Sequence, residues 1–165
     1  MPDGPLIVQS DRSVLLEVAH PQAADARHDL AVFAELERAP EHIHTYRITR
    51  LGLWNARAAG HTGQEMVDTL ERFSKFPIPT SVASDIIDTV GRYGRVRIER
   101  DDEGLVLTAD TTAILLEIIS NKKIAEFVGD RVSELSVRIG AWARGSIKQE
   151  LLNLGWPAED FAGFT

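Results

Sequence analysis

Hydrophobic residues recur at helical spacing through the middle of the chain, and strict alternation follows directly after them. Three such stretches, each preceded by a Thr or Ser that can cap the first turn, predict helices over 50–59, 63–75 and 82–93. Residues 95–100 alternate between charged and apolar side chains, which is typical of a strand, and 105–109 supply its return strand. Three helices followed by a hairpin is the order of a winged helix, so we expect one winged-helix-like unit over 49–109.

The pattern before this unit is more mixed. Loose alternation predicts a β-hairpin over 6–18, and 42–49 alternates like a half-buried strand. Between them, apolar residues at helical spacing predict one helix over 23–38, which Pro40 ends. We expect these elements to form a first part, residues 1–48.

The pattern after the hairpin predicts a second, smaller α/β arrangement. An apolar stretch predicts a helix over 111–120, and a short helix is expected to end at Gly129. Residues 135–139 predict a strand and 146–154 an amphipathic helix. These elements form a C-terminal part, residues 110–165, which we expect to pack with the winged-helix-like unit. The whole chain is therefore expected to have an α+β fold.

Composition narrows the class of protein. The 165 residues are 44% hydrophobic and 26% charged, which is typical of a globular chain, and they include no cysteine. The longest apolar stretch, around 113–119, is far shorter than the ~20 residues that cross a bilayer. The first five residues, Met1 to Pro5, lack the basic region of a secretory signal. We expect a soluble, cytoplasmic protein with no membrane partner.

The balance of charge argues against strong DNA binding. The chain has 25 acidic and 18 basic residues and a net charge of −7, whereas DNA binding depends on Lys and Arg that neutralise phosphates. Arg92, Arg95 and Arg97 form the one candidate cluster, at the end of the third helix and on the first hairpin strand. Asp85 and Asp88 on the third helix would repel phosphate. We therefore expect at most a weak DNA contact through the arginines, and a basic protein surface as a better partner for the two aspartates.

No motif in the sequence predicts catalysis. A phosphate-binding GxxxxGK[ST] loop, GxGxxG, HExxH, GxSxG and an EF-hand loop are all absent, so we predict no catalytic, cofactor-binding or metal-binding residue in this chain. His42 and His44 share one strand face and are interpreted as surface histidines. Trp142 lies in a glycine-flanked segment and is a candidate partner contact, although a residue covering the edge of the core is the favoured interpretation.

An ordered series of segments resembles the N-terminal region of XPB-type DNA helicases. The series runs through YRIT at 46–49, LWNARAAG at 53–60, LERFSKFPIP at 70–79, YGRVRI at 93–98 and IKQELLNLGWPAED at 147–160. Two further segments resemble the bacterial branch in particular, GPLIVQSD at 4–11 and FAELERAPEH at 33–42. The resemblance covers nearly the whole chain, and it is specific because of the order of the segments rather than any single one.

The resemblance implies a role without chemistry. XPB-type proteins are ATP-dependent DNA translocases of nucleotide excision repair, and their N-terminal region lies outside the motor. In eukaryotes this region docks on a neighbouring subunit of the transcription and repair factor TFIIH and regulates the ATPase. The resemblance therefore implies a non-catalytic regulatory or protein-interaction domain of a DNA repair helicase, with ATP and magnesium bound by the parent motor only. The implied partners are the downstream motor domains, or a repair nuclease or other repair protein.

One alternative of a different class stays open at this point. A winged-helix transcription regulator would bind DNA itself, through a basic third helix and a basic hairpin. The acids Asp85, Asp88 and Asp101–Glu103 contradict that arrangement. The sequence therefore favours the interaction domain, and it predicts that the chain ends before the motor begins.

Overall fold

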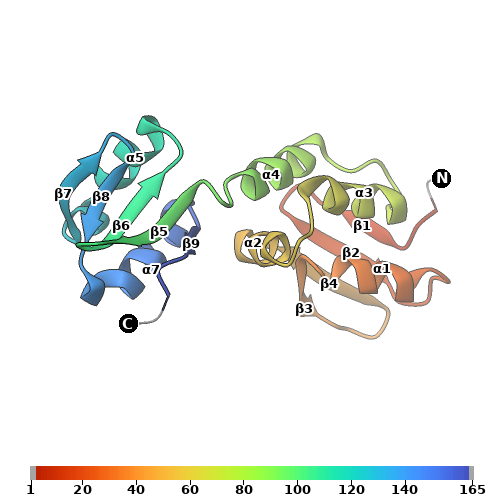
Figure 1. Cartoon of the computed structure of the whole chain (residues 1–165). Helices are drawn as coiled ribbons and strands as arrows, with labels where there is room; N and C mark the ends of the chain where they lie inside the picture. The colour runs from red at the N-terminus through yellow and green to blue at the C-terminus, as the bar shows by residue number, and fades with distance from the viewer. Residues whose placement is uncertain (1–2, 164–165) are drawn as a thin grey trace. The chain divides into compact units, whose positions relative to one another are not determined.

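The computed structural model describes residues 3–163. The chain divides into two compact units, with the boundary between residues 91 and 92 (Figure 1). We call them the N-terminal unit and the C-terminal unit. Over the described residues the chain forms seven α-helices and nine strands in two sheets, which confirms the α+β class. Met1, Pro2, Phe164 and Thr165 lie outside the described residues, and with them part of the expectations for the two ends of the chain.

A four-stranded antiparallel sheet and four helices make up the N-terminal unit. The strands lie in the order β1-β2-β4-β3, with bounds β1 Leu6–Val8, β2 Ser13–Glu17, β3 Ala34–Arg38 and β4 Ile43–Ile48. The helices are α1 Ala23–Leu30, α2 Arg50–Ala58, α3 Gly63–Phe73 and α4 Thr80–Gly91. Helix α1 contacts β2 and α3, and α2 contacts β3 and α4, so the four helices and the sheet share one core.

One face of this sheet is buried under the helices. Leu6 pairs with Leu16 and Val14 with Tyr46 across neighbouring strands, and all four are buried. Leu15, which points to the opposite face, is only half-buried. Because successive side chains of a strand point to opposite faces, the alternation in β2 places the core on a single side of the sheet.

The predicted starts of α2 and α3 are confirmed by their caps, whereas α4 begins at Thr80, before the predicted start at 82. The hydroxyl of Thr49 accepts a hydrogen bond from the Gly52 N–H at 3.0 Å, and the hydroxyl of Thr62 accepts one from the Glu65 N–H at 3.1 Å. These bonds satisfy backbone donors that the first turn of a helix leaves without a partner. Gly60, just after α2, has a φ of +104°, a conformation that glycine adopts more easily than other residues.

The single helix predicted over 23–38 is wrong beyond Leu30. Helix α1 ends there, and the chain continues as the edge strand β3, in which Ala34 pairs with Ile48. Leu30, at the end of α1, and Phe33, in the turn that follows, are both buried. Their spacing of three residues therefore imitates a helix face although the helix has already ended. Residues 34–38 form a strand because their backbone pairs with β4, which comes later in the sequence.

A five-stranded sheet and three helices make up the C-terminal unit. The strands lie in the order β7-β8-β6-β5-β9, with bounds β5 Val96–Asp101, β6 Gly104–Ala109, β7 Val128–Ser133, β8 Ser136–Ile139 and β9 Ala158–Asp160. The helices are α5 Thr112–Ile119, α6 Lys122–Ala125 and α7 Arg144–Leu154, with a 3-10 turn at Ala141–Ala143. Its core contains Val96, Leu107, Leu115 and Ile147 from these elements.

The hairpin is where the predicted parts and the compact units differ. The predicted strands are confirmed, with Val96 paired to Ala109. However, β6 also pairs with β8, and β5 pairs in parallel with β9, so the hairpin belongs to the sheet of the C-terminal unit. Helices α2, α3 and α4 belong to the N-terminal unit. The elements expected together over 49–109 are thus divided at Gly91, because pairing with two later strands carries the hairpin into the second sheet.

Candidate interaction surfaces

Arg92 makes its contacts at the C-terminal end of α7. Its guanidinium donates a hydrogen bond to the Gly155 carbonyl at 3.2 Å and lies 4.5 Å from the centre of the Trp156 ring. Gly155 ends the helix in the left-handed conformation, with a φ of +107°. A cation at this end of a helix is favourable, and so is one over the face of a tryptophan. Arg92 therefore stabilises the C-terminal unit.

Arg95 and Arg97 lie together at the start of β5, as the sequence predicts, but they share one carboxylate. Asp110 lies 2.9 Å from the Arg97 guanidinium and 3.7 Å from that of Arg95. Arg97 also donates a hydrogen bond to the Gly94 carbonyl at 3.1 Å. Two cations against one anion leave a single positive charge for a phosphate, which is little for a protein that binds DNA.

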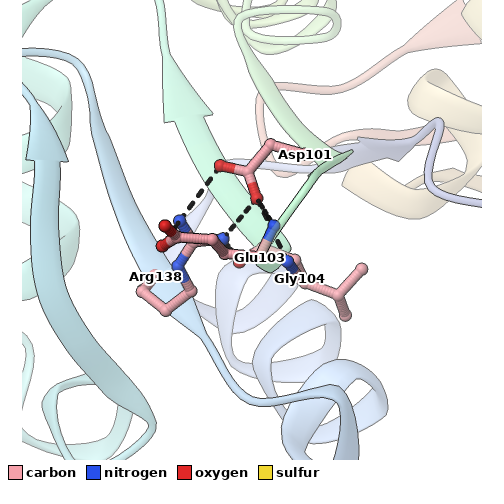
Figure 2. A network of polar contacts seen from close by, with 5 residues as sticks. Asp101, Glu103, Gly104 and Arg138 are labelled. Atoms are coloured by element: carbon pink, nitrogen blue, oxygen red, sulfur yellow. Dashed lines mark hydrogen bonds and ion pairs between the residues drawn. The ribbon is translucent and has the colours of Figure 1, made fainter.

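The acidic turn of the hairpin is built into the sheet rather than being simply solvated (Figure 2). Arg138 of β8 donates hydrogen bonds to both oxygens of Asp101, at 2.7 and 3.0 Å. Asp101 also accepts hydrogen bonds from the N–H groups of Glu103 and Gly104. Arg138 first, and the Glu103 N–H second, lower the pKa of Asp101 to about 2. The carboxylate thus fixes the turn against the neighbouring strand.

A second ion-pair group joins β9 to α7. Arg144 donates to both oxygens of Asp160, at 2.7 and 2.6 Å, and Lys148 donates at 3.1 Å. The Asp160 side chain is only 15% exposed, and the hydrogen bonds from Arg144 hold the pKa of Asp160 well below its usual range. This group was not predicted from the sequence, because no pattern indicates a strand at 158–160.

Asp85 and Asp88 of α4 differ in their surroundings. Asp85 accepts two hydrogen bonds from Arg12 in the turn between β1 and β2, at 3.0 and 3.2 Å, so part of its charge is neutralised. Asp88 is exposed, and no ion pair to it occurs among the described residues. Of the two acids expected to face a basic partner, Asp88 has the more open charge.

Trp142 is the most exposed large hydrophobic residue described, with 78% of its surface in contact with solvent. So much exposure contradicts the favoured interpretation that it covers the edge of the core. The ring meets that of Phe127 edge to face, with 5.7 Å between ring centres. A Cβ atom at Gly140 would lie 2.4 Å from the indole nitrogen of Trp142. The ring therefore lies directly on the backbone of a glycine, which holds it in place.

A cleft between α1 and α3 was not predicted. It measures about 260 Å³ and is lined by Asp29, Val32, Phe33, His61, Glu65, Met66, Asp68, Thr69 and Arg72; we call it the α1–α3 cleft. The cleft could not be predicted from one helix over 23–38, because Val32 and Phe33, which line it, lie in a turn and not in a helix. One sequence signal existed: Glu65 and Asp68 are like charges three residues apart on one helix face, an unfavourable arrangement.

Neither a metal site nor a membrane span is found within residues 3–163. No three His, Asp or Glu side chains in this range are grouped as ligands of a metal ion. His42 is exposed, whereas His44 is half-buried, and its Nδ1 atom has no hydrogen-bond partner. None of the described helices has the length and apolar character that crossing a bilayer requires.

Comparison with known proteins gives a family and several relatives. Residues 6–133 match the family model described as a helicase conserved C-terminal domain. Two bacterial proteins, each called DNA 3′-5′ helicase XPB, are 53% identical to the chain over 165 residues; they come from Kineococcus radiotolerans and Mycobacterium tuberculosis. The XPB/SSL2 helicase/translocase subunit of general transcription and DNA repair factor IIH from Saccharomyces cerevisiae is 34% identical over 92 residues, 56% of this chain and 11% of that protein.

The extent of these matches is unequal. Each bacterial match covers 99% of this chain but 30% of the relative. The chain therefore spans less than a third of the length of the helicases that it matches.

Proposed function

This chain belongs to the XPB-type DNA helicases, and we propose that it regulates the helicase by protein contact. It corresponds to the N-terminal region of these helicases, although the matching family model is described as a C-terminal domain. In this proposal the chain performs no chemistry. ATP binding, magnesium binding and DNA unwinding in nucleotide excision repair belong to the motor of the parent protein. The proposed partner is that motor, with a repair nuclease or another repair protein as the second candidate.

The observation that carries the proposal is the contrast between the arginines and Trp142. Arg92 and Arg97 donate hydrogen bonds to carbonyl groups and to Asp110 within the C-terminal unit. Trp142 is instead held outward, against Phe127 and Gly140. Exposed tryptophans dominate the binding energy of many protein interfaces, and a side chain that is already ordered loses little entropy on binding. This supports contact with a protein over contact with DNA.

The alternative, a winged-helix regulator that binds DNA, needs cations on its recognition helix. Helix α4 would take that role, and it contains Asp85 and Asp88 but no Lys or Arg. Arg97 of the hairpin and Arg138 of the neighbouring strand β8 are paired with Asp110 and Asp101. These contacts favour the interaction module.

The proposal is tested in the parent helicase. Removal of residues 1–165 is expected to change DNA-stimulated ATPase and unwinding at unchanged DNA affinity, and the purified chain is expected to bind the purified motor. Trp142→Ala should weaken that binding by roughly ten-fold or more, as expected for an interface anchor. Phe161→Ala is the matched control, since Phe161 is also a largely exposed aromatic residue of the C-terminal unit.

Two results would contradict the proposal. If ATPase, unwinding and motor binding were all unchanged, the region would be a passive appendage. If the deletion lowered DNA affinity alone, the winged-helix alternative would replace it.

A further inference from the structure

The α1–α3 cleft has an apolar floor within the acidic N-terminal unit. Phe33 and Met66 are buried beneath it, and Val32, which is 40% exposed, lies on its wall. Val32 offers the apolar surface from which the methylene groups of an incoming side chain displace water, a gain in free energy. The cleft therefore suits a side chain with an apolar stem.

The charges around the floor are mostly negative. Asp29, Glu65 and Asp68 line the cleft together with one cation, Arg72, which lies 3.5 Å from Asp29. Glu65 contacts His61, and Asp68 accepts a hydrogen bond from the neutral amide of Gln64. No Lys or Arg pairs with Glu65 or Asp68 among the described residues. Within residues 3–163, these two carboxylates of the rim thus have no Lys or Arg partner, and Glu65 has only the His61 contact.

Size and charge together restrict the occupant. A volume of about 260 Å³ is below the roughly 300–1,000 Å³ of pockets that hold cofactors or drug-sized ligands. The carboxylates would repel a phosphate backbone, which argues against nucleic acid. The described residues also provide no group of three ligands for a metal ion. A single basic side chain of a protein satisfies all three limits.

We propose that the α1–α3 cleft receives an arginine side chain of the partner protein. Its methylene stem lies against Val32, and its guanidinium binds Glu65 and Asp68. These two carboxylates are one helical turn apart on the same face of α3, and the planar guanidinium has five N–H donors that serve both at once. The proposal rests on the proposed function, because it assumes that the module acts by protein contact.

The test uses residues 1–165, labelled with nitrogen-15, and a blocked pentapeptide of sequence Gly-Leu-Arg-Leu-Gly. We expect amide shift changes at residues that line the cleft, and a binding that weakens by about five-fold or more when citrulline replaces the arginine. The double variant Glu65→Gln, Asp68→Asn should weaken binding of the arginine peptide by a similar factor. It removes a like-charge pair from one face of α3, so the helix is expected to fold.

Glu71→Gln is the matched control, since Glu71 is exposed on α3 and does not line the cleft. This variant should bind the arginine peptide as the unmodified chain does. Equal binding of the citrulline peptide, equal binding by the double variant, or shift changes confined to other residues would overturn the proposal.

The same double variant in the parent helicase separates this proposal from the proposed function. If deletion of residues 1–165 alters ATPase but the double variant does not, the regulatory function stands and the cleft is not its contact. If the cleft binds the arginine peptide but the deletion changes nothing, the site stands and the regulatory function fails.

Discussion

The two units of this chain use their charged residues in different ways. The N-terminal unit has 8 Lys and Arg against 13 Asp and Glu, and the C-terminal unit has 10 against 12. In the C-terminal unit, Arg138 and Arg144 each bind both oxygens of a carboxylate on another element. In the N-terminal unit, each ion pair reaches only one oxygen of its carboxylate, as in Arg12–Asp85, Arg47–Glu37, Lys75–Glu17 and Arg72–Asp29.

This difference explains why counting arginines misleads. The C-terminal unit contains the arginines that suggested DNA binding, but they make their contacts inside that unit. Arg92 contacts Gly155 and Trp156, and Arg95 and Arg97 face Asp110. Strand β9 has only three residues and β7 pairs irregularly with β8, so both edges of the sheet gain little from backbone pairing alone. The N-terminal unit has more acidic than basic residues, and this excess is what we propose a basic protein recognises.

The largest effect that tests this comparison is on stability. Asp160→Asn should lower the free energy of unfolding by about 1.5–3 kcal/mol, because it removes charge-assisted hydrogen bonds from Arg144 and Lys148. Asp85→Asn in the N-terminal unit should cost only about 0.2–1 kcal/mol, since its ion pair with Arg12 is nearly half exposed. Urea unfolding followed by circular dichroism measures both. Equal losses would mean that the two units do not differ in this respect.

The ion pair at the hairpin turn predicts how stability depends on pH. The folded-state pKa of Asp101 is about 2, below its ordinary value of 3.8, so the pair contributes fully above pH 3.8 and is lost as pH falls to 2. Arg138→Met should therefore be less stable than the unmodified chain near neutral pH. The gap in urea midpoint should close as pH falls to about 2. A gap that stayed constant with pH would show that Arg138 acts through packing instead.

Local signals in the sequence predicted much of the fold. Thr49 and Thr62 cap their helices as expected, since a cap depends on residues within one turn. The hairpin followed from the strict alternation of 95–100 for the same reason. The edge strands β3, β7 and β9 were missed because backbone pairing with other strands decides them. Of the six residues of β7, five are exposed, so no hydrophobic alternation marks it.

The candidate site was less predictable than the fold. Arg95 and Arg97 were correctly placed together because they are only two residues apart, at the start of β5. Their neutralisation by Asp110 was missed, and so was the bond between Asp101 and Arg138, whose residues are 37 positions apart. The cleft was missed because it depends on the turn after α1, where tertiary packing overrides helical spacing. Spacing alone identifies which residues share an element, and the fold decides which charges meet.

Removal of Asp110 tests whether the arginines of the C-terminal unit have any capacity for DNA. The unmodified chain should bind duplex DNA weakly and in a salt-sensitive manner. Asp110→Asn frees the charges of Arg95 and Arg97, and we expect affinity at low salt to rise by about three- to ten-fold, with a salt slope steeper by about one phosphate contact. Fluorescence anisotropy with a labelled duplex measures both quantities.

Two controls define the DNA result. The triple variant Asp110→Asn, Arg95→Ala, Arg97→Ala should return to weak binding. Nanomolar binding by the unmodified chain at physiological salt, unaffected by alanine at Arg95 and Arg97, would place the DNA surface elsewhere and remove the contrast between the units.

The smallest expected effect concerns the position of Trp142. Gly140 has a φ of −77°, which any residue adopts, so the backbone does not require glycine there. The indole ring does, because a Cβ atom at this position would clash with it. Gly140→Ala should displace the ring and change stability by less than about 1 kcal/mol, because the ring is already exposed. Trp54 and Trp156 are 4% and 7% exposed, so quenching of tryptophan fluorescence by iodide reports mainly on Trp142. The variant should show altered quenching and weaker motor binding at nearly wild-type stability; unchanged motor binding would mean that the fixed position of the ring is not what the partner recognises.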